Sequence, residues 1–176
     1  MALKEILQER IHSDDIRRIC ALCCNDNAVK EELYALIFDP EARVAYNALW
    51  VFTQFSSEER MWLLPKREML IDLLLSKNHI GMQRLLFTLL DRLPARYDVM
   101  RPDYLDFCLS KINSGEPYAV RALSLKQAYV CCRAYPELMR ELLYEIDRME
   151  NGNISPGLQS ARRNILRKLT SYKTMK

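Results

Sequence analysis

Cysteine and histidine are the residues of this chain with the widest chemical range, because both bind metals and both serve in catalysis. Cys20 and Cys23 have the spacing of a zinc or redox pair. A structural zinc site needs a second pair of ligands, and neither the other four cysteines nor His12 and His79 supply one at zinc-finger spacing. We therefore predict free cysteines that are buried as small hydrophobic side chains in a reducing cytoplasm, with no metal and no cofactor.

Carboxylate pairs are the next candidates for chemistry. Asp14-Asp15, Glu31-Glu32 and Glu58-Glu59 resemble general acid–base pairs. Each pair falls near the first turn of an expected helix, where negative charge complements the helix dipole. The sequence also lacks the common phosphate-loop, dinucleotide, zinc-protease and serine-hydrolase motifs. These observations favour a protein that is not an enzyme.

Arginine and glutamine side chains recur at one position of a long repeat. Four of them lie early in the second helix of successive expected helix pairs, at separations of 40, 38 and 38 residues: Arg43, Gln83, Arg121 and Gln159. Such side chains either face a ligand or bond to acidic and carbonyl groups of the neighbouring repeat, which stabilises the stack. Together with nearby polar and basic positions, the candidate binding residues are Arg43, Asn47, Gln83, Arg84, Arg121, Arg162, Arg163, Arg167 and Lys168.

Charge is distributed unevenly along the chain. Residues 1–150 carry 20 basic and 23 acidic side chains, whereas residues 151–176 carry six basic side chains and no acidic one. The last expected helix is therefore basic and amphipathic, with Leu158, Ala161, Ile165, Leu169 and Tyr172 on its apolar face. It is interpreted as a polar end cap, as a nucleic-acid contact or as a contact with an anionic membrane or partner. The cap is favoured, because a terminal repeat needs a polar outer face.

The positioning elements are all expected to be helices. Hydrophobic side chains make up 49% of the chain, which contains only four glycines, too few for the turns of a sheet protein. Three expected helix starts are Asp39-Pro40, the capping box Ser56-Ser57-Glu58-Glu59, and Ser155-Pro156. Breaks are expected at Ala95–Met100 and Asn151–Asn153. Pairing the helices yields units near 1–24, 27–55, 57–93, 101–135 and 136–172.

Three stretches carry a family resemblance. They are D-P-E-A-R-V-A-Y-N-A-L from Asp39, E-P-Y-A-V-R-A-L-S-L from Glu116 and S-P-G-L-Q-S-A-R-R-N-I-L from Ser155. Each resembles the second helix of a HEAT repeat. The resemblance implies an all-α protein, a right-handed α-α superhelix (solenoid) of about five antiparallel helix pairs forming one domain over residues 1–176. Its second helices would line the concave face, where the candidate binding residues would lie.

The same resemblance implies a function. We expect a non-catalytic protein-interaction scaffold with a protein partner, located in the cytoplasm and with no membrane span. The sequence does not specify the oligomeric state. The alternative is a nucleic-acid-binding or DNA-alkylation-repair-like HEAT protein that uses the basic C-terminal helix and the concave arginines. Tyr46, Trp50 and Trp62 would then be stacking aromatics, although packing within or between repeats is favoured for all three.

Overall fold

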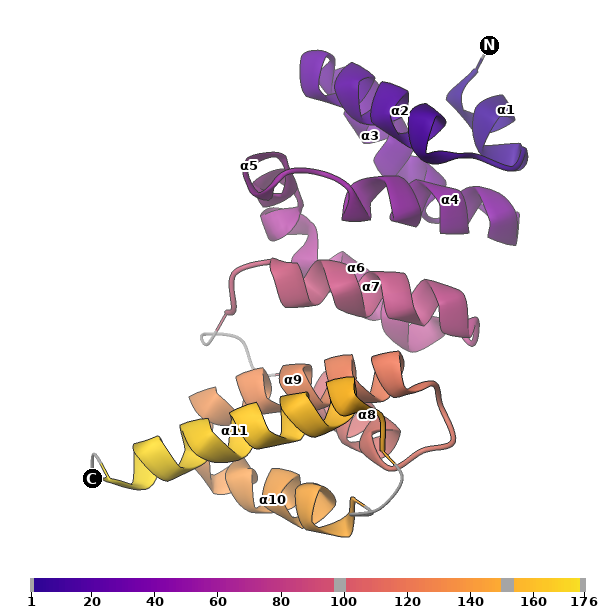
Figure 1. Ribbon diagram of the computed structural model, residues 1–176. Coiled ribbons are helices and arrows are strands. Elements are labelled where there is room, and N and C mark those ends of the chain that lie inside the picture. The colour runs from indigo at the N-terminus through magenta and orange to yellow at the C-terminus, as the bar shows by residue number, and fades with distance from the viewer. Residues whose placement is uncertain (1, 97–100, 150–153, 175–176) are drawn as a thin grey trace. The chain divides into compact units, whose positions relative to one another are not determined.

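The computed structural model describes residues 2–96, 101–149 and 154–174, and within these ranges every regular element is a helix (Figure 1). The predicted all-α class is confirmed. Of the expected break at Ala95–Met100, Ala95 and Arg96 lie outside any helix, and its remaining residues, like the expected break at Asn151–Asn153, lie outside the described residues. The α-helices are α1 (Leu3–Gln8), α2 (Ser13–Asn25), α3 (Asn27–Leu36), α4 (Ala42–Thr53), α5 (Ser57–Arg60), α6 (Arg67–Ser76), α7 (Ile80–Arg92), α8 (Pro102–Ile112), α9 (Tyr118–Ala134), α10 (Met139–Arg148) and α11 (Pro156–Thr174).

Two short 3₁₀ helices complete the chain, η1 (Met61–Lys66) and η2 (Pro136–Leu138). The chain divides into two compact units, Met1–Leu93 and Pro94–Lys176. Pro65 lies inside η1, where the α-helix is interrupted because proline cannot donate an α-helical hydrogen bond.

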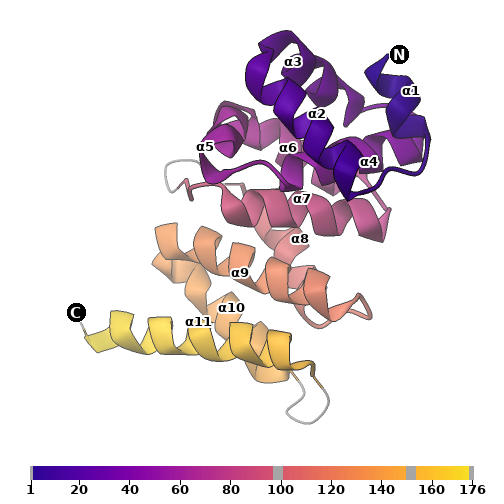
Figure 2. The ribbon, with the colours of Figure 1, turned by 45° about the horizontal axis from the view of Figure 1, so that its top comes forward.

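Helix α4 is the centre of the first unit. It contacts α1, α2 and α3 on one side and α7 on the other (Figures 1 and 2). Most of its side chains are therefore buried, and Ala48, Leu49 and Phe52 are at most 1% exposed. One strip of α4 reaches the surface with helical spacing, formed by Arg43, Tyr46 and Trp50 and continued by the C-cap residue Gln54.

The start of α4 differs from the sequence prediction. Asp39 and Pro40 were expected to cap and open this helix, but its first residue is Ala42. The Asp39 carboxylate instead accepts hydrogen bonds from Lys4 Nζ at 2.7 Å and from the Glu41 amide at 2.9 Å. The side chain thus closes a short turn and makes an ion pair with α1, which displaces the helix start by two residues.

The predicted capping box at α5 is only half formed. Ser56 Oγ accepts a hydrogen bond from the Glu59 amide at 3.1 Å, as expected. The reciprocal bond is replaced by a longer-range one, because the Glu59 carboxylate binds Lys30 Nζ at 2.7 Å. An ion pair to a neighbouring helix therefore takes the place of the local contact.

Trp62 belongs to the packing of the first unit. Its ring stacks on Phe52 with an interplanar angle of 8° and meets Tyr34 edge-on. Lys66 Nζ lies 4.2 Å from the Trp62 ring centroid and 4.7 Å from that of Tyr34. These contacts support the packing interpretation of Trp62, because the indole is engaged by Phe52, Tyr34 and Lys66.

The second unit is built around α9. Helices α8 and α11 lie beside α9, and α10 contacts both α8 and α9. Ser155 Oγ accepts a hydrogen bond from the Leu158 amide and Pro156 is the first residue of α11, so the predicted cap is confirmed. The apolar face of α11 is buried as predicted at Leu158, Ala161, Ile165 and Leu169. Tyr172, expected on the same face, belongs to α11, but the surroundings of its side chain are not described.

Candidate interaction groove

The repeated position in the second helices has the same local role in each repeat. All four side chains donate a hydrogen bond to a main-chain carbonyl at or beyond the end of an earlier helix. The bonds run from Arg43 Nη1 to Gln8 at 3.4 Å, from Gln83 Nε2 to Lys77 at 2.6 Å, from Arg121 Nε to Ile112 at 2.8 Å and from Gln159 Nε2 to Ile154 at 3.1 Å. Gln8, Lys77 and Ile112 lie at helix ends, where carbonyls lack a partner within their own helix, so these three bonds stabilise the helix ends. The carbonyl of Ile154 lies in the segment just before α11, which Gln159 holds.

Asn47, another candidate binding residue, makes the same kind of contact from inside the protein. Its side chain is 6% exposed. Its Nδ2 donates to the carbonyl of Leu7 at 2.9 Å and to that of Glu9 at 3.1 Å. Both carbonyls lie where α1 ends and the chain turns toward α2. Asn47 therefore holds the segment between α1 and α2 against α4.

The remaining candidate residues lie nearer the surface. Arg84 is exposed on α7, and Arg163, Arg167 and Lys168 are exposed on α11, whereas Arg162 is half-buried. Arg167 Nη2 donates to Asn164 Oδ1 at 2.6 Å, and Lys168 Nζ lies 5.5 Å from the Tyr129 ring centroid. The structure therefore places Arg43, Asn47, Gln83 and Arg84 in the first unit and Arg121, Arg162, Arg163, Arg167 and Lys168 in the second.

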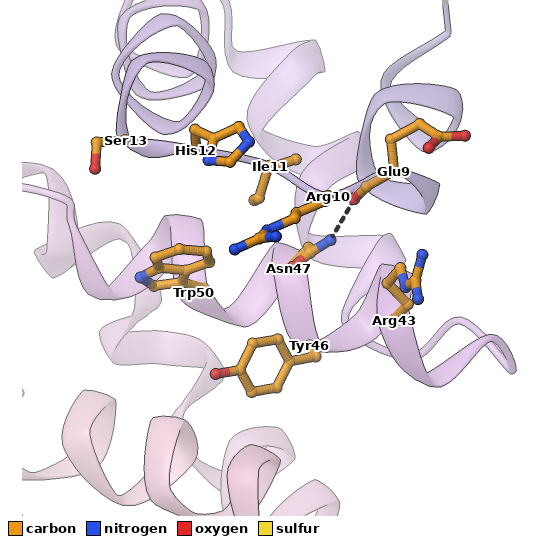
Figure 3. A pocket seen from close by; sticks show the side chains of 9 residues that line it. All are labelled: Glu9, Arg10, Ile11, His12, Ser13, Arg43, Tyr46, Asn47 and Trp50. Atoms are coloured by element: carbon orange, nitrogen blue, oxygen red, sulfur yellow. Dashed lines mark hydrogen bonds between the residues drawn. The ribbon is translucent and has the colours of Figure 1, made fainter.

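A hollow opens beside Asn47, between the segment joining α1 to α2 and the exposed strip of α4 (Figure 3). Its volume is about 580 Å³, and it is lined by Glu9, Arg10, Ile11, His12, Ser13, Arg43, Tyr46, Asn47 and Trp50. A second hollow of about 360 Å³ shares Ser13 and Trp50 with the first and adds Ile16, Arg17, Cys20 and Gln54. We call the two hollows together the α4 groove.

Arg10 supplies the charge at the middle of the α4 groove. Its guanidinium extends into the hollow between Trp50 and Asn47, while the carboxylate of Glu9 points away (Figure 3). Within the part of the chain that the structure describes, the Arg10 side chain has no hydrogen bond or ion pair. An exposed guanidinium in a hollow is available to a carboxylate or phosphate from outside.

Tyr46 and Trp50 provide the apolar surface of the groove. Both are half-buried and lie one helical turn apart on α4. The Tyr46 ring meets the His79 ring at a centroid distance of 6.1 Å. A Cβ atom at Gly81 would lie 3.0 Å from Tyr46 Cε2, so the missing side chain at Gly81 leaves space for the ring. The contact with His79 and Gly81 on α7 supports the packing interpretation for Tyr46, whereas the half-buried Trp50 ring lines the hollow.

The titratable groups around the groove include a half-buried thiol and a histidine that caps a helix. Burial, followed by the neighbouring Cys24, raises the pKa of Cys20 to about 11, so this thiol on the groove wall is protonated at neutral pH. His79 Nδ1 accepts a hydrogen bond from the Met82 amide and caps α7. No group of three or more histidine, cysteine or acidic side chains that could hold a metal occurs among the described residues.

The buried cysteines are found largely where the sequence placed them. Cys23, Cys108 and Cys132 are fully buried, Cys20 is half-buried, and all six thiols are free. Burial is the main cause that raises the pKa of Cys23 and of Cys132 to about 12. The prediction of core packing is confirmed for Cys23 and Cys108.

Sequence reasoning missed Arg10. The predicted unit near 1–24 did not locate the connection between its helices, whereas in the structure α1 ends at Gln8 and Arg10 lies in the connection that Asn47 holds. Tyr46 and Trp50 were recognisable from their spacing of four residues, which places them on one face of a helix. No local signal marks Arg10, because its position depends on a contact with a helix more than thirty residues later.

Comparison with known families fits this arrangement of helix pairs. Residues 3–169 match a family model described as a HEAT repeat domain. Comparisons with curated proteins and with solved structures find no match. No described helix combines the length and the apolar character required to cross a bilayer.

Proposed function

This chain belongs to the HEAT repeat family, whose members are generally protein-interaction scaffolds, and we propose that it is a non-catalytic module that binds a partner segment in the α4 groove. The observation that carries the proposal is the exposed Arg10 guanidinium beside the half-buried rings of Tyr46 and Trp50. Aromatic and arginine side chains of this kind provide much of the binding energy at protein interfaces.

The dimensions of the groove suit a short extended segment. The exposed strip of α4 runs from Arg43 to Gln54, which corresponds to about 16 Å at a rise of about 1.5 Å per residue. An extended peptide advances about 3.3 Å per residue, so about five residues would cover the strip. A linear segment of a partner protein fits this shape and leaves the helix packing unchanged.

The six free thiols support a cytoplasmic location for the module. Thiols stay reduced in the cytosol, whereas secreted proteins commonly pair them in disulfides. We accordingly propose that the partner is also an intracellular protein.

Selection from a library of random twelve-residue peptides would test the proposal. We expect the wild-type chain to enrich related sequences, and Trp50→Ala to weaken the best peptide by at least about tenfold, as for a central aromatic contact. Tyr144→Ala is the matched control, because Tyr144 is 63% exposed on α10 and does not line the groove. Circular dichroism would confirm that both variants fold. No enrichment, or equal binding by the wild type and Trp50→Ala, would contradict the proposal.

Nucleic-acid binding by α11 is the second candidate function. The observation that favours it is the group of exposed basic side chains Arg163, Arg167 and Lys168 on a helix whose sequence has no acidic residue. Fluorescence anisotropy with labelled duplex and single-stranded oligonucleotides would test it at 50 and 200 mM salt. Binding that weakens steeply with salt and with Arg163→Glu supports this function. Absence of binding at 50 mM salt excludes it.

A further inference from the structure

We infer that the segment bound in the α4 groove is acidic, with a carboxylate held by Arg10 and a bulky apolar side chain placed two residues away against Trp50. This inference rests on the proposed function, because it specifies the chemistry of the partner at the same site. It follows from the unpaired guanidinium of Arg10, from the net charge of the first unit, and from the positions of the charged and apolar lining residues along α4.

The charge within the groove is positive. Arg10 has no ion pair or hydrogen bond within the described ranges, and the Arg43 guanidinium makes one long hydrogen bond of 3.4 Å. Of the lining residues of the first hollow only Glu9 is acidic, and its carboxylate points away from Arg10 (Figure 3). Guanidinium groups bind carboxylates through two parallel N–H···O bonds, which combine charge with directional contact.

The net charge of the first unit as a whole disfavours the binding of a long polyanion. Residues 1–93 contain 12 basic and 14 acidic side chains, so their formal net charge is −2. Electrostatic attraction in physiological salt decays over about 8 Å, so the parts of a longer ligand that extend past the groove gain little from its arginines and lie over a unit whose net charge is negative. A peptide with one or two carboxylates interacts mainly with the positive groove. This difference favours an acidic peptide over a nucleic acid at this site.

The apolar part of the groove sets the position of the second anchor. The second hollow lies beyond Trp50, where Ile16, Cys20 and Gln54 complete its wall. From Asn47, beside Arg10, to the middle of this hollow is about five residues of α4, or about 7 Å at the helical rise. Side chains two residues apart in an extended chain point to the same side at about this separation. An acidic residue and a bulky apolar residue at positions i and i+2 therefore match the groove.

The inference can be tested by sequencing the peptides that the random library enriches. We expect an acidic residue two positions from an aromatic or large aliphatic residue in either direction, and at least tenfold weaker binding of the best peptide to Arg10→Glu. The same library selected on Arg10→Glu should enrich lysine or arginine at the acidic position. Arg18→Glu is the matched control, because Arg18 is exposed on α2 and does not line the groove. Its binding should stay within about twofold of the wild type.

The outcomes separate this inference from the proposed function. Enriched peptides that depend on Trp50 but lack an acidic residue, or that bind Arg10→Glu equally well, would overturn the acidic partner and leave the groove as a peptide site. No enrichment, or binding that is insensitive to Trp50→Ala, would overturn both. A labelled single-stranded oligonucleotide that displaces the selected peptide at 150 mM salt and itself binds in an Arg10-dependent way would also contradict the inference.

Discussion

Replacement of Asn47 is expected to show how much a buried hydrogen-bonding side chain contributes to the stability of the first unit. The Asn47 amide is buried and donates to two carbonyls at the end of α1, at 2.9 and 3.1 Å. Asn47→Ala removes both donors, and Asn47→Asp places a carboxylate opposite the same two carbonyl oxygens. Aspartate has the same shape as asparagine, so Asn47→Asp reports the electrostatic part of the contact, whereas Asn47→Ala also removes packing at this buried position.

The expected magnitude follows from the two bonds. The bond to Leu7 is buried, and a buried carbonyl without a partner costs about 1–3 kcal/mol. The bond to Glu9 is only partly buried, so water can replace the lost donor there at smaller cost. We therefore expect Asn47→Ala to lower the free energy of unfolding by about 2–3 kcal/mol. Asn47→Asp should cost more at pH 7, because an ionised carboxylate repels both carbonyl oxygens.

The pH dependence of Asn47→Asp has a defined sign. Burial and the facing carbonyls raise the pKa of the introduced carboxyl in the folded state above its unfolded value of about 3.9. The folded state then binds the proton more tightly than the unfolded state, so the penalty is smallest at low pH. It should grow as the pH rises above about 4 and reach its full size above the folded-state pKa.

Urea unfolding followed by tryptophan fluorescence is the appropriate assay. Trp50 and Trp62 are the only tryptophans of the sequence, and both lie in residues 1–93, so the signal follows the first unit. Asn164→Ala is a suitable control, because Asn164 is exposed on α11 in the second unit. A loss below about 0.5 kcal/mol for Asn47→Ala, which is smaller than a typical net hydrogen bond, would refute the reasoning. Equal losses for the two variants at pH 7 would refute the electrostatic part.

Three further predictions concern charge, thiols and cooperativity. The hydrogen bond from Lys4, with that from the backbone of Glu41, lowers the pKa of Asp39. Asp39→Asn should therefore have a lower urea midpoint than the wild type at pH 7, and the two midpoints should converge as the pH falls below about 4. A constant difference down to pH 3 would be inconsistent. In the folded protein a thiol reagent such as DTNB should modify the exposed Cys24 well before the buried Cys23, and equal rates would contradict the packing. If residues 1–176 are one cooperative domain, urea transitions by tryptophan fluorescence and by far-ultraviolet circular dichroism should coincide, and separate midpoints would exclude it.

The sequence predicted those features that depend on local chemistry. Ser155 and Pro156 carry the signal for the start of α11 within a few residues, and the structure confirms it. The start of α4 was wrong because the Asp39 carboxylate pairs with Lys4, a residue 35 positions earlier. Local capping preferences contain no information about such distant partners. The start of α11 was therefore predictable from local sequence, whereas the start of α4 depends on a side chain that binds another part of the fold.

The candidate site was predictable to a smaller degree for the same reason. The periodic position of Gln83 and Arg121 was visible in the sequence, and so was the alternative that these side chains bond to carbonyls. The sequence could not show that Arg10 lies opposite Trp50, because the segment that carries Arg10 is positioned by Asn47. The groove arises from tertiary contacts between α1, α2 and α4.

The hydrogen bonds of the second helices differ greatly in the length of chain that they close. Gln83 reaches a carbonyl six residues away, and Arg121 one nine residues away, whereas Asn47 reaches Leu7 across 40 residues. Closing the longer loop costs about 2 kcal/mol more in chain entropy than closing the six-residue one. The six-residue helix α1 should therefore open more readily than the helix pairs, and amide hydrogen exchange in α1 should slow when a peptide occupies the groove. Because α1 anchors one wall of the groove, its docking and the binding of a partner are thermodynamically coupled.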